Sequence, residues 1–312
     1  MARIVCGVDV SKSELEACLG EAESSRTFAN TAEGVHALYR FCRVCGVELV
    51  VMEATGGLEK LAFLLLWKSG LPCAMVNPRQ IRRFAEAAGA LEKTDAIDAR
   101  IIAQYARAMG IAETPPPSDD QQRLEALTTR LSQIVADLVV QKQRRHTSDE
   151  PIARASIEEA IAFLNGQARR FEAEIADQIA QDPLWARLDA ALRSVKGVAS
   201  RTVARLLAEL PEIGVYNNKA IAKLAGLAPL ANDSGSRRGQ RHIRGGRAGV
   251  RSILFIVAGL AMRFDEKLKA FHDNLIQKGK PKMVARTALA RKLLVILNAR
   301  AREAREAYAF ET

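Results

Sequence analysis

The sequence of 312 residues predicts a mixed α/β domain followed by a helical region. Three observations point to this fold class. Short β-branched runs alternate with helical patterns in the first third of the chain, apolar residues then recur with a helical period, and a run of three prolines separates the two kinds of pattern. At roughly 150 residues per domain, a chain of this length accommodates about two domains, each able to bury a core.

The α/β pattern contains five predicted strands. They cover residues 3–10, 14–20, 24–30, 47–54 and 71–77. The first two form a hairpin around a Ser-Lys turn, and the fourth is a near-continuous apolar run, which is typical of a strand buried on both faces of a parallel sheet. Helices are predicted at 31–46, 58–70 and 94–109. Three initial strands followed by alternating helices and strands predict a mixed sheet of the ribonuclease-H type.

Beyond the α/β pattern, the prolines at 115–117 form a stiff spacer that marks a domain boundary. Apolar residues then step by threes and fours from Leu124 to Leu138 and from Ile157 to Ile175, with a turn between the two stretches. This heptad spacing predicts an antiparallel coiled-coil hairpin, which serves either as a spacer or as an oligomerisation arm. The predicted domains are an α/β domain at 1–114, a linker with the coiled-coil hairpin at 115–185, and a helical domain at 186–312.

Within the helical domain, two apolar helical stretches flank a turn that contains Lys196 and Gly197. The arrangement resembles a helix-hairpin-helix element, in which a glycine lets backbone N–H groups approach a phosphate near a helix N-terminus. We therefore expect Lys196 and Gly197 to contact nucleic acid. Any glycine turn between two helices would give a similar pattern.

The net charge of +10 and the pI of 9.6 favour a polyanionic partner. An aromatic content of 5% argues against a protein that binds single-stranded nucleic acid by base stacking. The longest apolar runs, 61–67 and 253–262, are shorter than the roughly 20 residues of a membrane span. The N-terminus lacks the features of a signal peptide. We expect no membrane association.

Cysteine usage indicates a reducing compartment. All five cysteines lie in the first quarter of the chain without a disulfide pattern, which predicts a cytoplasmic protein. Cys42 and Cys45 form a single CxxC with only His36 nearby. We interpret this pair as small apolar residues on one helix face rather than as a zinc or redox site.

Four acids stand out by their placement. Asp9 lies inside an apolar strand, Glu53 closes another, and Asp95 and Asp98 share one face of a helix. If the two strands are neighbours, the four carboxylates converge, and they then require a cation such as Mg²⁺ or Mn²⁺ of the kind used in phosphoryl transfer. The structural alternative is that Asp95 favours the helix start after Thr94 and that Glu53 merely ends a strand.

These residues resemble a known family. The motifs 7–12 (GVDVSK), 53–56 (EATG) and 93–99 (KTDAIDA) are similar to the RuvC-like domain of insertion-sequence transposases of the IS one-ten type, which include the Piv-like DNA invertases. The resemblance covers nearly the whole chain in matching order. It implies that the four acids bind divalent metal and take part in catalysis.

A second group of candidate residues begins at Ser234, after which no acidic residue occurs up to Phe264. Arginine donates bidentate hydrogen bonds to phosphate, and the interspersed glycines let the backbone approach a polyanion. The candidate nucleic-acid-binding arginines are Arg237, Arg238, Arg241, Arg244, Arg247 and Arg251. The simpler alternative is a basic surface loop without such a role.

From residue chemistry alone, Ser234 is a turn residue in a glycine-rich loop. The segment LAGLAP at 224–229, followed by Ser-Gly, a basic stretch and Gly-Gly-x-x-x-x-Arg, resembles the C-terminal transposase domain of the same family. The resemblance implies that Ser234 is the nucleophile. Ser236 has no glycine after it and is the weaker candidate.

The function that the resemblance implies is the cutting and joining of donor and target DNA through a phosphoserine intermediate, with help from divalent metal. It also implies a noncoding bridge RNA that selects the DNA sites by base pairing. We expect a homo-oligomer, either a dimer or a tetramer. Because Ser234 is distant from the acids in the chain, the two regions would have to close on each other within or between subunits.

Two other functions remain open. A RuvC-like nuclease that resolves branched DNA would use the acids and water and would form no covalent intermediate. A non-enzymatic helix-hairpin-helix protein would bind DNA, and its acids would be structural. A denaturation-resistant protein–DNA adduct distinguishes the first alternative from a transposase, and metal-independent action identifies the second.

Overall fold

The computed structural model describes residues 3–19, 25–90, 95–234, 239 and 241–311, without the side chains of residues 95–97. The chain forms two compact units, Met1–Pro117 and Ser118–Thr312. The boundary lies at the end of the proline run. The second unit contains both the segment predicted as a coiled-coil hairpin and the predicted C-terminal helices.

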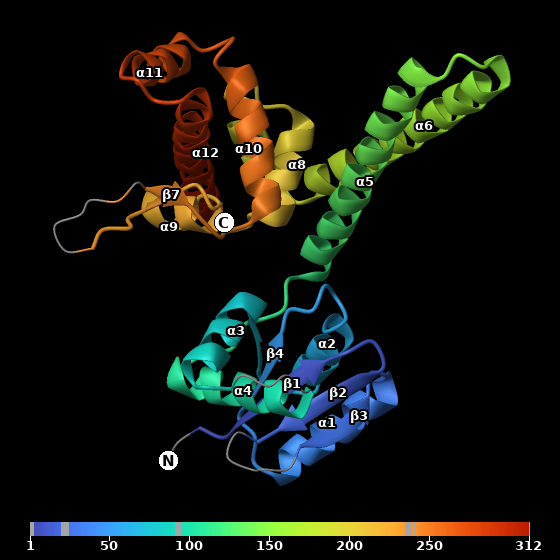
Figure 1. The fold of residues 1–312 in the computed structure, drawn as a ribbon, viewed down its shortest axis with the longest axis vertical. Coiled ribbons are helices and arrows are strands. Elements are labelled where there is room, and N and C mark those ends of the chain that lie inside the picture. The colour runs from blue at the N-terminus through green and yellow to red at the C-terminus, as the bar shows by residue number, and fades with distance from the viewer. Residues whose placement is uncertain (1–2, 20–24, 91–94, 235–238, 240, 312) are drawn as a thin grey trace. The chain divides into compact units, whose positions relative to one another are not determined.

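In its described part, the first unit is built on a five-stranded mixed sheet with the order β3-β2-β1-β4-β5 (Figure 1). The strands are β1 (Val5–Val10), β2 (Glu14–Cys18), β3 (Arg26–Ala29), β4 (Leu49–Glu53) and β5 (Cys73–Val76). β1 pairs antiparallel with β2 and parallel with β4, and β4 pairs parallel with β5. The mixed sheet predicted from the sequence is confirmed.

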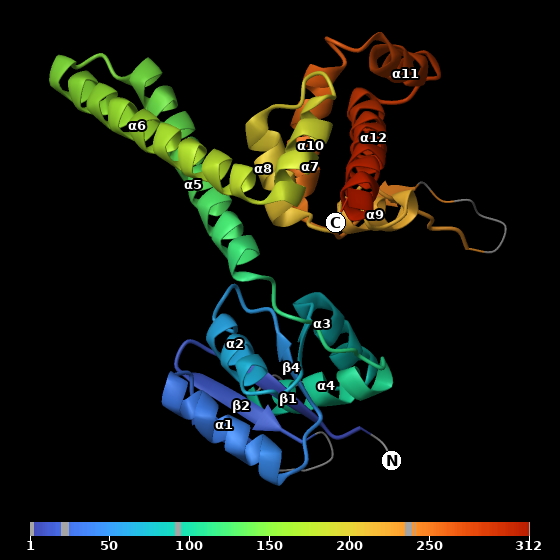
Figure 2. The same ribbon diagram turned by 180° about the vertical axis from the view of Figure 1, so that it is seen from behind.

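Helices cover both faces of this sheet. α1 (Ala32–Val44) and α2 (Lys60–Lys68) pack on one face, where they bury Val8, Val50 and other strand residues. α3 (Pro78–Ala87) and α4 (Asp95–Ala108) pack on the other face, against Val5, Val51 and their neighbours. The two opposite views show α4 over one face and α1 over the other (Figures 1 and 2).

The sequence predicts no helix at the position of α3, because Pro78 is interpreted there only as the residue that stops the strand at 71–77. In the structure, the side chain of Asn77 caps the new helix and accepts a hydrogen bond from the backbone N–H of Arg79 at 2.9 Å. Proline is tolerated in the first helical turn, since the N–H that it lacks would have no partner there. The Asn-Pro pair is therefore a helix start here.

The second unit is helical apart from two short strands. Its elements are α5 (Asp119–Thr147), α6 (Pro151–Gln181), α7 (Pro183–Arg193), α8 (Ser200–Glu209), α9 (Asn218–Leu224), β6 (Pro229–Leu230), β7 (His242–Ile243), α10 (Ala248–Ala261), α11 (Glu266–Gln277) and α12 (Lys282–Glu311). α5 and α6 lie along each other (Figure 1) and bury predicted heptad residues such as Leu131 and Ile175. Their identity as a coiled coil remains a prediction. None of the helices in the described residues is long and apolar enough to cross a membrane.

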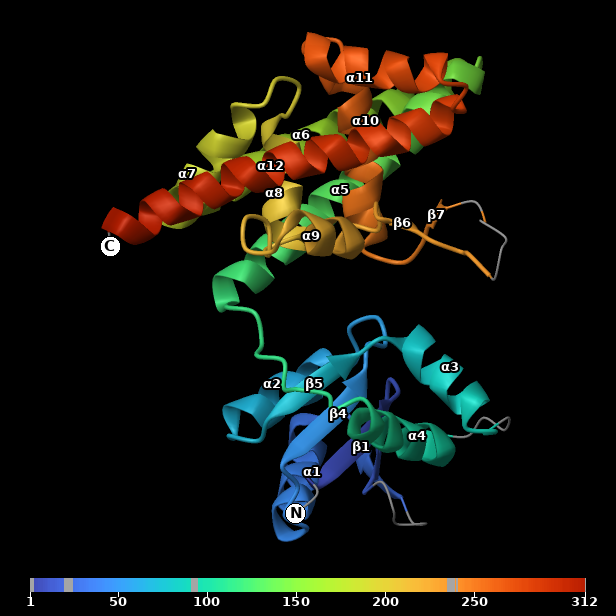
Figure 3. The same ribbon diagram turned by 90° about the vertical axis from the view of Figure 1, so that its left-hand side faces the viewer.

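The long helix α12 extends along the second unit (Figure 3) and buries Leu293, Leu297 and Asn298 among its neighbours. The side chain of Asn298 is fully buried. It accepts a hydrogen bond from the backbone N–H of Gly214 at 2.8 Å and donates one to the carbonyl of Tyr216 at 3.0 Å. These bonds fix the turn that leads into α9.

The cysteines of the first unit all have free thiols. A hydrogen bond with Cys42, together with burial, raises the pKa of Cys6 well above its usual value, and burial raises the pKa of Cys73 to about 12. Both thiols therefore remain protonated at neutral pH. Their role is packing in the core between the sheet and α1 and α2.

Candidate active site and nucleic-acid interface

Asp9 and Glu53 lie side by side toward the carboxyl ends of two neighbouring parallel strands, β1 and β4. The parallel register pairs Val8 of β1 with Met52 of β4, so the next residues along these strands are Asp9 and Glu53. Neighbouring strands are about 4.8 Å apart, and alternate side chains point to opposite faces. Val8 packs toward α1 and α2, so the two acids project toward the face that α3 and α4 cover.

Gly7 sets how closely α4 approaches this face. A Cβ atom on Gly7 would lie 2.1 Å from the carbonyl oxygen of Ala99 and 2.5 Å from the backbone nitrogen of Ala103. Glycine in β1 and alanines on α4 thus let the helix backbone contact the strand directly. Asp98 precedes Ala99, so this contact brings its carboxylate to the end of β1, close to Asp9.

Asp9, Glu53 and Asp98 line one pocket with a cavity volume of about 730 Å³, which we call the acid pocket. It lies at the carboxyl ends of the parallel strands, where ligands commonly bind in open α/β sheets. The predicted convergence of these three acids is thus observed as a shared cavity. The side chain of Asp95, the fourth acid, lies outside the described residues.

A further wall of the acid pocket is formed by Arg79, Arg82 and Arg83 of α3. The sequence analysis did not identify these arginines, because it predicted no helix there. Their spacing of three and four residues after an Asn-Pro helix start was the available signal. The acid pocket therefore combines carboxylates with cationic side chains.

The chemistry of the acid pocket fits a hard divalent cation, since carboxylate oxygens are the ligands that Mg²⁺ and Mn²⁺ prefer. Within the part of the chain that the structure describes, however, no three histidine, cysteine or carboxylate side chains are spaced to hold a metal ion. Asp9, Glu53 and Asp98 thus share a cavity, but their described positions are not those of three ligands around one metal ion.

Ser234 is exposed in the loop between β6 and β7 of the second unit. These strands pair antiparallel, with Leu230 opposite His242. Further along the loop, the carboxylate of Asp233 accepts a hydrogen bond from the backbone N–H of Gly239 at 3.1 Å. The serine hydroxyl is thus accessible on a hairpin whose two sides are held together.

The Gly-Gly-x-x-x-x-Arg motif holds the base of this hairpin. Gly246 has a φ of +67°, and a Cβ there would lie 2.2 Å from the backbone nitrogen of Gly226. The guanidinium of Arg251 donates a hydrogen bond to the carbonyl of Gly245 at 2.7 Å. In the structure, the motif joins the hairpin to the end of α9.

Two of the predicted nucleic-acid contacts are therefore engaged inside the unit. Arg251 holds the glycine turn, and Arg247 donates two hydrogen bonds to the carboxylate of Glu212, one of them at 2.6 Å. These bonds give both arginines a part in the fold. A guanidinium has five N–H donors, so a contact of either arginine with nucleic acid remains a prediction. Arg241 and Arg244 are exposed, while Arg237 and Arg238 lie outside the described residues.

In the turn between α7 and α8, Lys196 is exposed and Gly197 has a φ of +87°. A Cβ on Gly197 would lie 2.7 Å from the Cα of Ala261. The glycine is thus required by packing against the end of α10. A phosphate contact at this turn remains a prediction.

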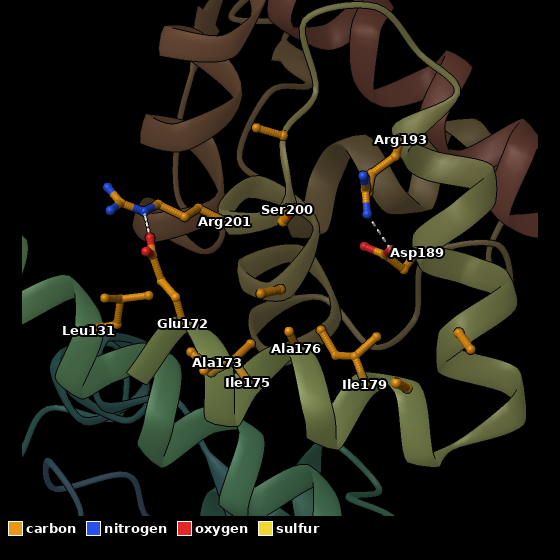
Figure 4. Close-up of a pocket in the computed structure, with 14 residues that line it drawn as sticks. Leu131, Glu172, Ala173, Ile175, Ala176, Ile179, Asp189, Arg193, Ser200 and Arg201 are labelled. Carbon is orange, nitrogen blue, oxygen red and sulfur yellow. Dashed lines mark hydrogen bonds and ion pairs between the residues drawn. The ribbon is translucent and has the colours of Figure 1, made fainter. Parts of the chain in front are cut away.

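The second unit contains a cavity of about 720 Å³ among α6, α7 and α8 (Figure 4). Alanine and isoleucine side chains line much of it. Both arginines that line this cavity have acidic partners, since Arg193 pairs with Asp189 at 3.2 Å and Arg201 pairs with Glu172. The cavity therefore differs from the acid pocket, where Arg82 pairs with Glu86 and neither Arg79 nor Arg83 forms an ion pair with a described residue.

Comparison with protein families defines the class of protein. Residues 6–147 match a family model described as a transposase, and residues 189–273 match a model described as the IS116/IS110/IS902 transposase family. A transposase is an enzyme of DNA recombination. The chain belongs to the IS110 family of insertion-element transposases.

Individual relatives agree with this assignment. The chain is 26% identical to the pilin gene-inverting protein of Moraxella bovis, with 95% of each chain covered, and equally similar to that of Moraxella lacunata. It is 30% identical over 150 residues to a 43.6 kDa protein of insertion element IS110 from Streptomyces coelicolor, covering 47% of this chain and 36% of that protein.

A solved structure, Thermus thermophilus RuvC, matches 35% of this chain and 98% of its own length at 15% identity and a TM-score of 0.27.

Proposed function

We propose that this transposase cuts and joins donor and target DNA, with the acid pocket as one half of its active site. The observation that carries the proposal is the convergence of Asp9, Glu53 and Asp98, from two strands and a helix, on one cavity. Carboxylates that share a cavity repel one another, and a bound cation would relieve this repulsion. The membership of the chain in a transposase family supports phosphoryl transfer on DNA as the reaction.

Asp9, Glu53, Asp98 and Asp95 would hold Mg²⁺ or Mn²⁺ in the acid pocket. When bound, the ion would stabilise negative charge on the phosphoryl oxygens during transfer. The strands fix Asp9 and Glu53, and the contact of α4 with Gly7 fixes Asp98. The fold thus positions the carboxylates of Asp9, Glu53 and Asp98, and a bound cation would draw them together as its ligands.

Ser234 would act as the nucleophile. Its hydroxyl oxygen would form a bond to phosphorus while one P–O ester bond of the DNA strand breaks, and the departing oxygen would take up a proton. The exposure of Ser234 and the support of its hairpin by Arg251 favour this role. The reaction needs Ser234 and the acid pocket to act on the same phosphodiester.

A noncoding bridge RNA would select the donor and target sites by base pairing, and the protein would then recognise the backbone. The contacts to nucleic acid would come from Lys196, Gly197, Arg237, Arg238, Arg241, Arg244, Arg247 and Arg251. Strand exchange between two sites would require a homo-oligomer, a dimer or a tetramer. In such an assembly α5 and α6 would act as a coiled-coil arm.

The experiment that tests the proposal is covalent trapping. Purified protein is incubated with labelled DNA from the element ends, its noncoding RNA and Mg²⁺, and is then denatured in detergent. We expect a labelled protein–DNA adduct with the wild-type chain and none with Ser234→Ala. Asp9→Asn should also abolish the adduct, because it removes a carboxylate of the acid pocket.

Ser236→Ala is the matched control and should still form the adduct. If Ser234→Ala forms the adduct as well, the nucleophile is assigned wrongly. DNA cutting without any adduct would instead identify a RuvC-like nuclease that uses water. If Asp9→Asn leaves the biological effect and DNA binding intact, the non-enzymatic alternative stands.

A further inference from the structure

The α3 wall of the acid pocket carries a cationic surface that the proposed chemistry does not use. Arg79, Arg82 and Arg83 occupy positions three and four residues apart, so they lie on one face of α3. All three are exposed and line the acid pocket. Ile81, on another side of the helix, is buried against the core beneath. The helix is thus anchored by its apolar side and presents arginines to the cavity.

The arginines differ in their partners. Arg82 pairs with Glu86 one turn later at 3.3 Å. Within the described part of the chain, the guanidinium groups of Arg79 and Arg83 form no hydrogen bond or ion pair. They line the same cavity as Asp9, Glu53 and Asp98. Two guanidinium groups therefore remain available to an anion from outside.

The position of Arg79 is unfavourable for the helix itself. It follows Pro78 in the first turn of α3, which contains no acidic residue. A positive charge at this end opposes the helix dipole, which favours anions there. Helix stability therefore does not explain Arg79. An anionic ligand beside the first turn of α3 would explain its position, and Arg83 lies one turn further along the same face.

The cavity as a whole indicates the kind of anion. A small isolated anion would be repelled by the carboxylates of Asp9, Glu53 and Asp98 in the same cavity. A phosphodiester strand avoids this repulsion, since one phosphate can lie near the cation held by the acids while neighbouring phosphates contact the arginines. The planar guanidinium donates two parallel hydrogen bonds to phosphate.

We infer that Arg79 and Arg83 bind the backbone of the DNA strand that is cut and hold it across the acid pocket. This inference rests on the proposed function, because it assigns the strand to DNA on which the acids act. It adds α3 to the substrate-binding surface. Arg82, which is paired with Glu86, has a smaller part in this contact.

The test is the salt dependence of DNA binding. The full-length double variant Arg79→Ala/Arg83→Ala and the wild type are titrated with a fluorescent single-stranded DNA oligonucleotide. The buffer contains Ca²⁺ in place of Mg²⁺, which leaves a hard cation for the acid pocket and does not support cutting. Each phosphate contact contributes about 0.7 to the slope of log affinity against log salt for single strands. We expect the slope to fall by about 1.4 and the affinity to fall by about tenfold or more.

The matched control is Arg40→Ala/Arg43→Ala, which removes two exposed arginines from α1, on the other face of the sheet. It lowers the net charge equally and should leave the slope unchanged. If the α3 variant is unstable, the single variants Arg79→Gln and Arg83→Gln each test one contact, with a slope change of about 0.7.

An unchanged slope, or the same decrease in the α1 control, overturns the inference. A decrease that is seen with an RNA oligonucleotide and not with DNA also overturns it, and would assign α3 to the RNA instead. The covalent adduct is measured separately. Normal adduct formation with an unchanged slope would refute the role of α3 and leave the proposed function standing.

Discussion

Replacing Gly7 by alanine should disturb both the stability of the first unit and the acid pocket. The added Cβ would lie 2.1 Å from the carbonyl oxygen of Ala99 and 2.5 Å from the backbone nitrogen of Ala103. Both atoms belong to the backbone of α4, so no side-chain rotation relieves the contact. To restore ordinary van der Waals separation, α4 must withdraw from β1 by roughly 1 Å.

The magnitude follows from this geometry. Overpacking a core costs about 1–3 kcal/mol, and a clash with backbone belongs at the upper end of that range. The free energy of unfolding should thus fall by about 3 kcal/mol. Because Asp98 adjoins Ala99, the same movement displaces its carboxylate, and a misplacement of about 1 Å can cost roughly 100-fold in rate.

Urea unfolding followed by circular dichroism measures the first effect, and the rate of covalent adduct formation measures the second. Gly166→Ala is the control, since a Cβ there meets nothing within 4 Å. In the interior of α6 this change should stabilise the protein by up to about 1 kcal/mol. Adding Ala103→Gly to Gly7→Ala should not restore stability, because the clash is with backbone. If Gly7→Ala retains wild-type stability and rate, the close contact of α4 with β1 is wrong.

Three further predictions follow from single contacts. Asp98→Asn should lower the adduct rate at least about 100-fold while changing the free energy of unfolding by less than about 1 kcal/mol, and equal loss of both would indicate a structural role. Burial alone would raise the pKa of Glu212, but its hydrogen bonds and the charge of Arg247 leave that pKa below its usual value. Wild type should therefore exceed Glu212→Gln in stability above about pH 5 and lose this advantage toward pH 3, as urea unfolding across pH would show; a constant difference would contradict the pairing. Asn298→Ala leaves the buried N–H of Gly214 without its partner and should lower the unfolding free energy by about 2 kcal/mol or more in the same assay, whereas a change within error would refute its role in the turn.

The sequence predicted the mixed sheet because local patterns specify strands and helices. Alternation at 3–10 and 14–20 indicated a hairpin, and the apolar run at 47–54 indicated a buried parallel strand; β1, β2 and β4 lie within these ranges. From the sequence, Asp9 and Glu53 are predicted to meet only if their two strands are neighbours. Whether β1 and β4 are neighbours depends on how the chain between them crosses over, and neither segment alone determines this.

The basic residues show the limit of sequence reasoning most clearly. The sequence predicts that Arg247 and Arg251 contact phosphate, because they lie with other arginines in one stretch without acidic residues. The fold places Glu212 and the carbonyl of Gly245 against their guanidinium groups and thereby gives them a structural role that the sequence did not indicate. Arginine can donate to an acid, a carbonyl or a phosphate, so the position of the partner decides which of these it bonds.

The sequence by itself determined the kinds of residue that this transposase uses: acids within and beside apolar strands, a serine in a glycine-rich loop, and a cationic surplus of +10. The tertiary structure decided which of them meet. It brought Asp9, Glu53 and Asp98 into one cavity, placed α3 with its arginines at the same cavity, and bonded Arg247 and Arg251 to Glu212 and to the carbonyl of Gly245. The physical reason is that local periodicity follows from neighbouring residues, whereas electrostatic partnership depends on distances of a few ångströms between residues far apart in the chain.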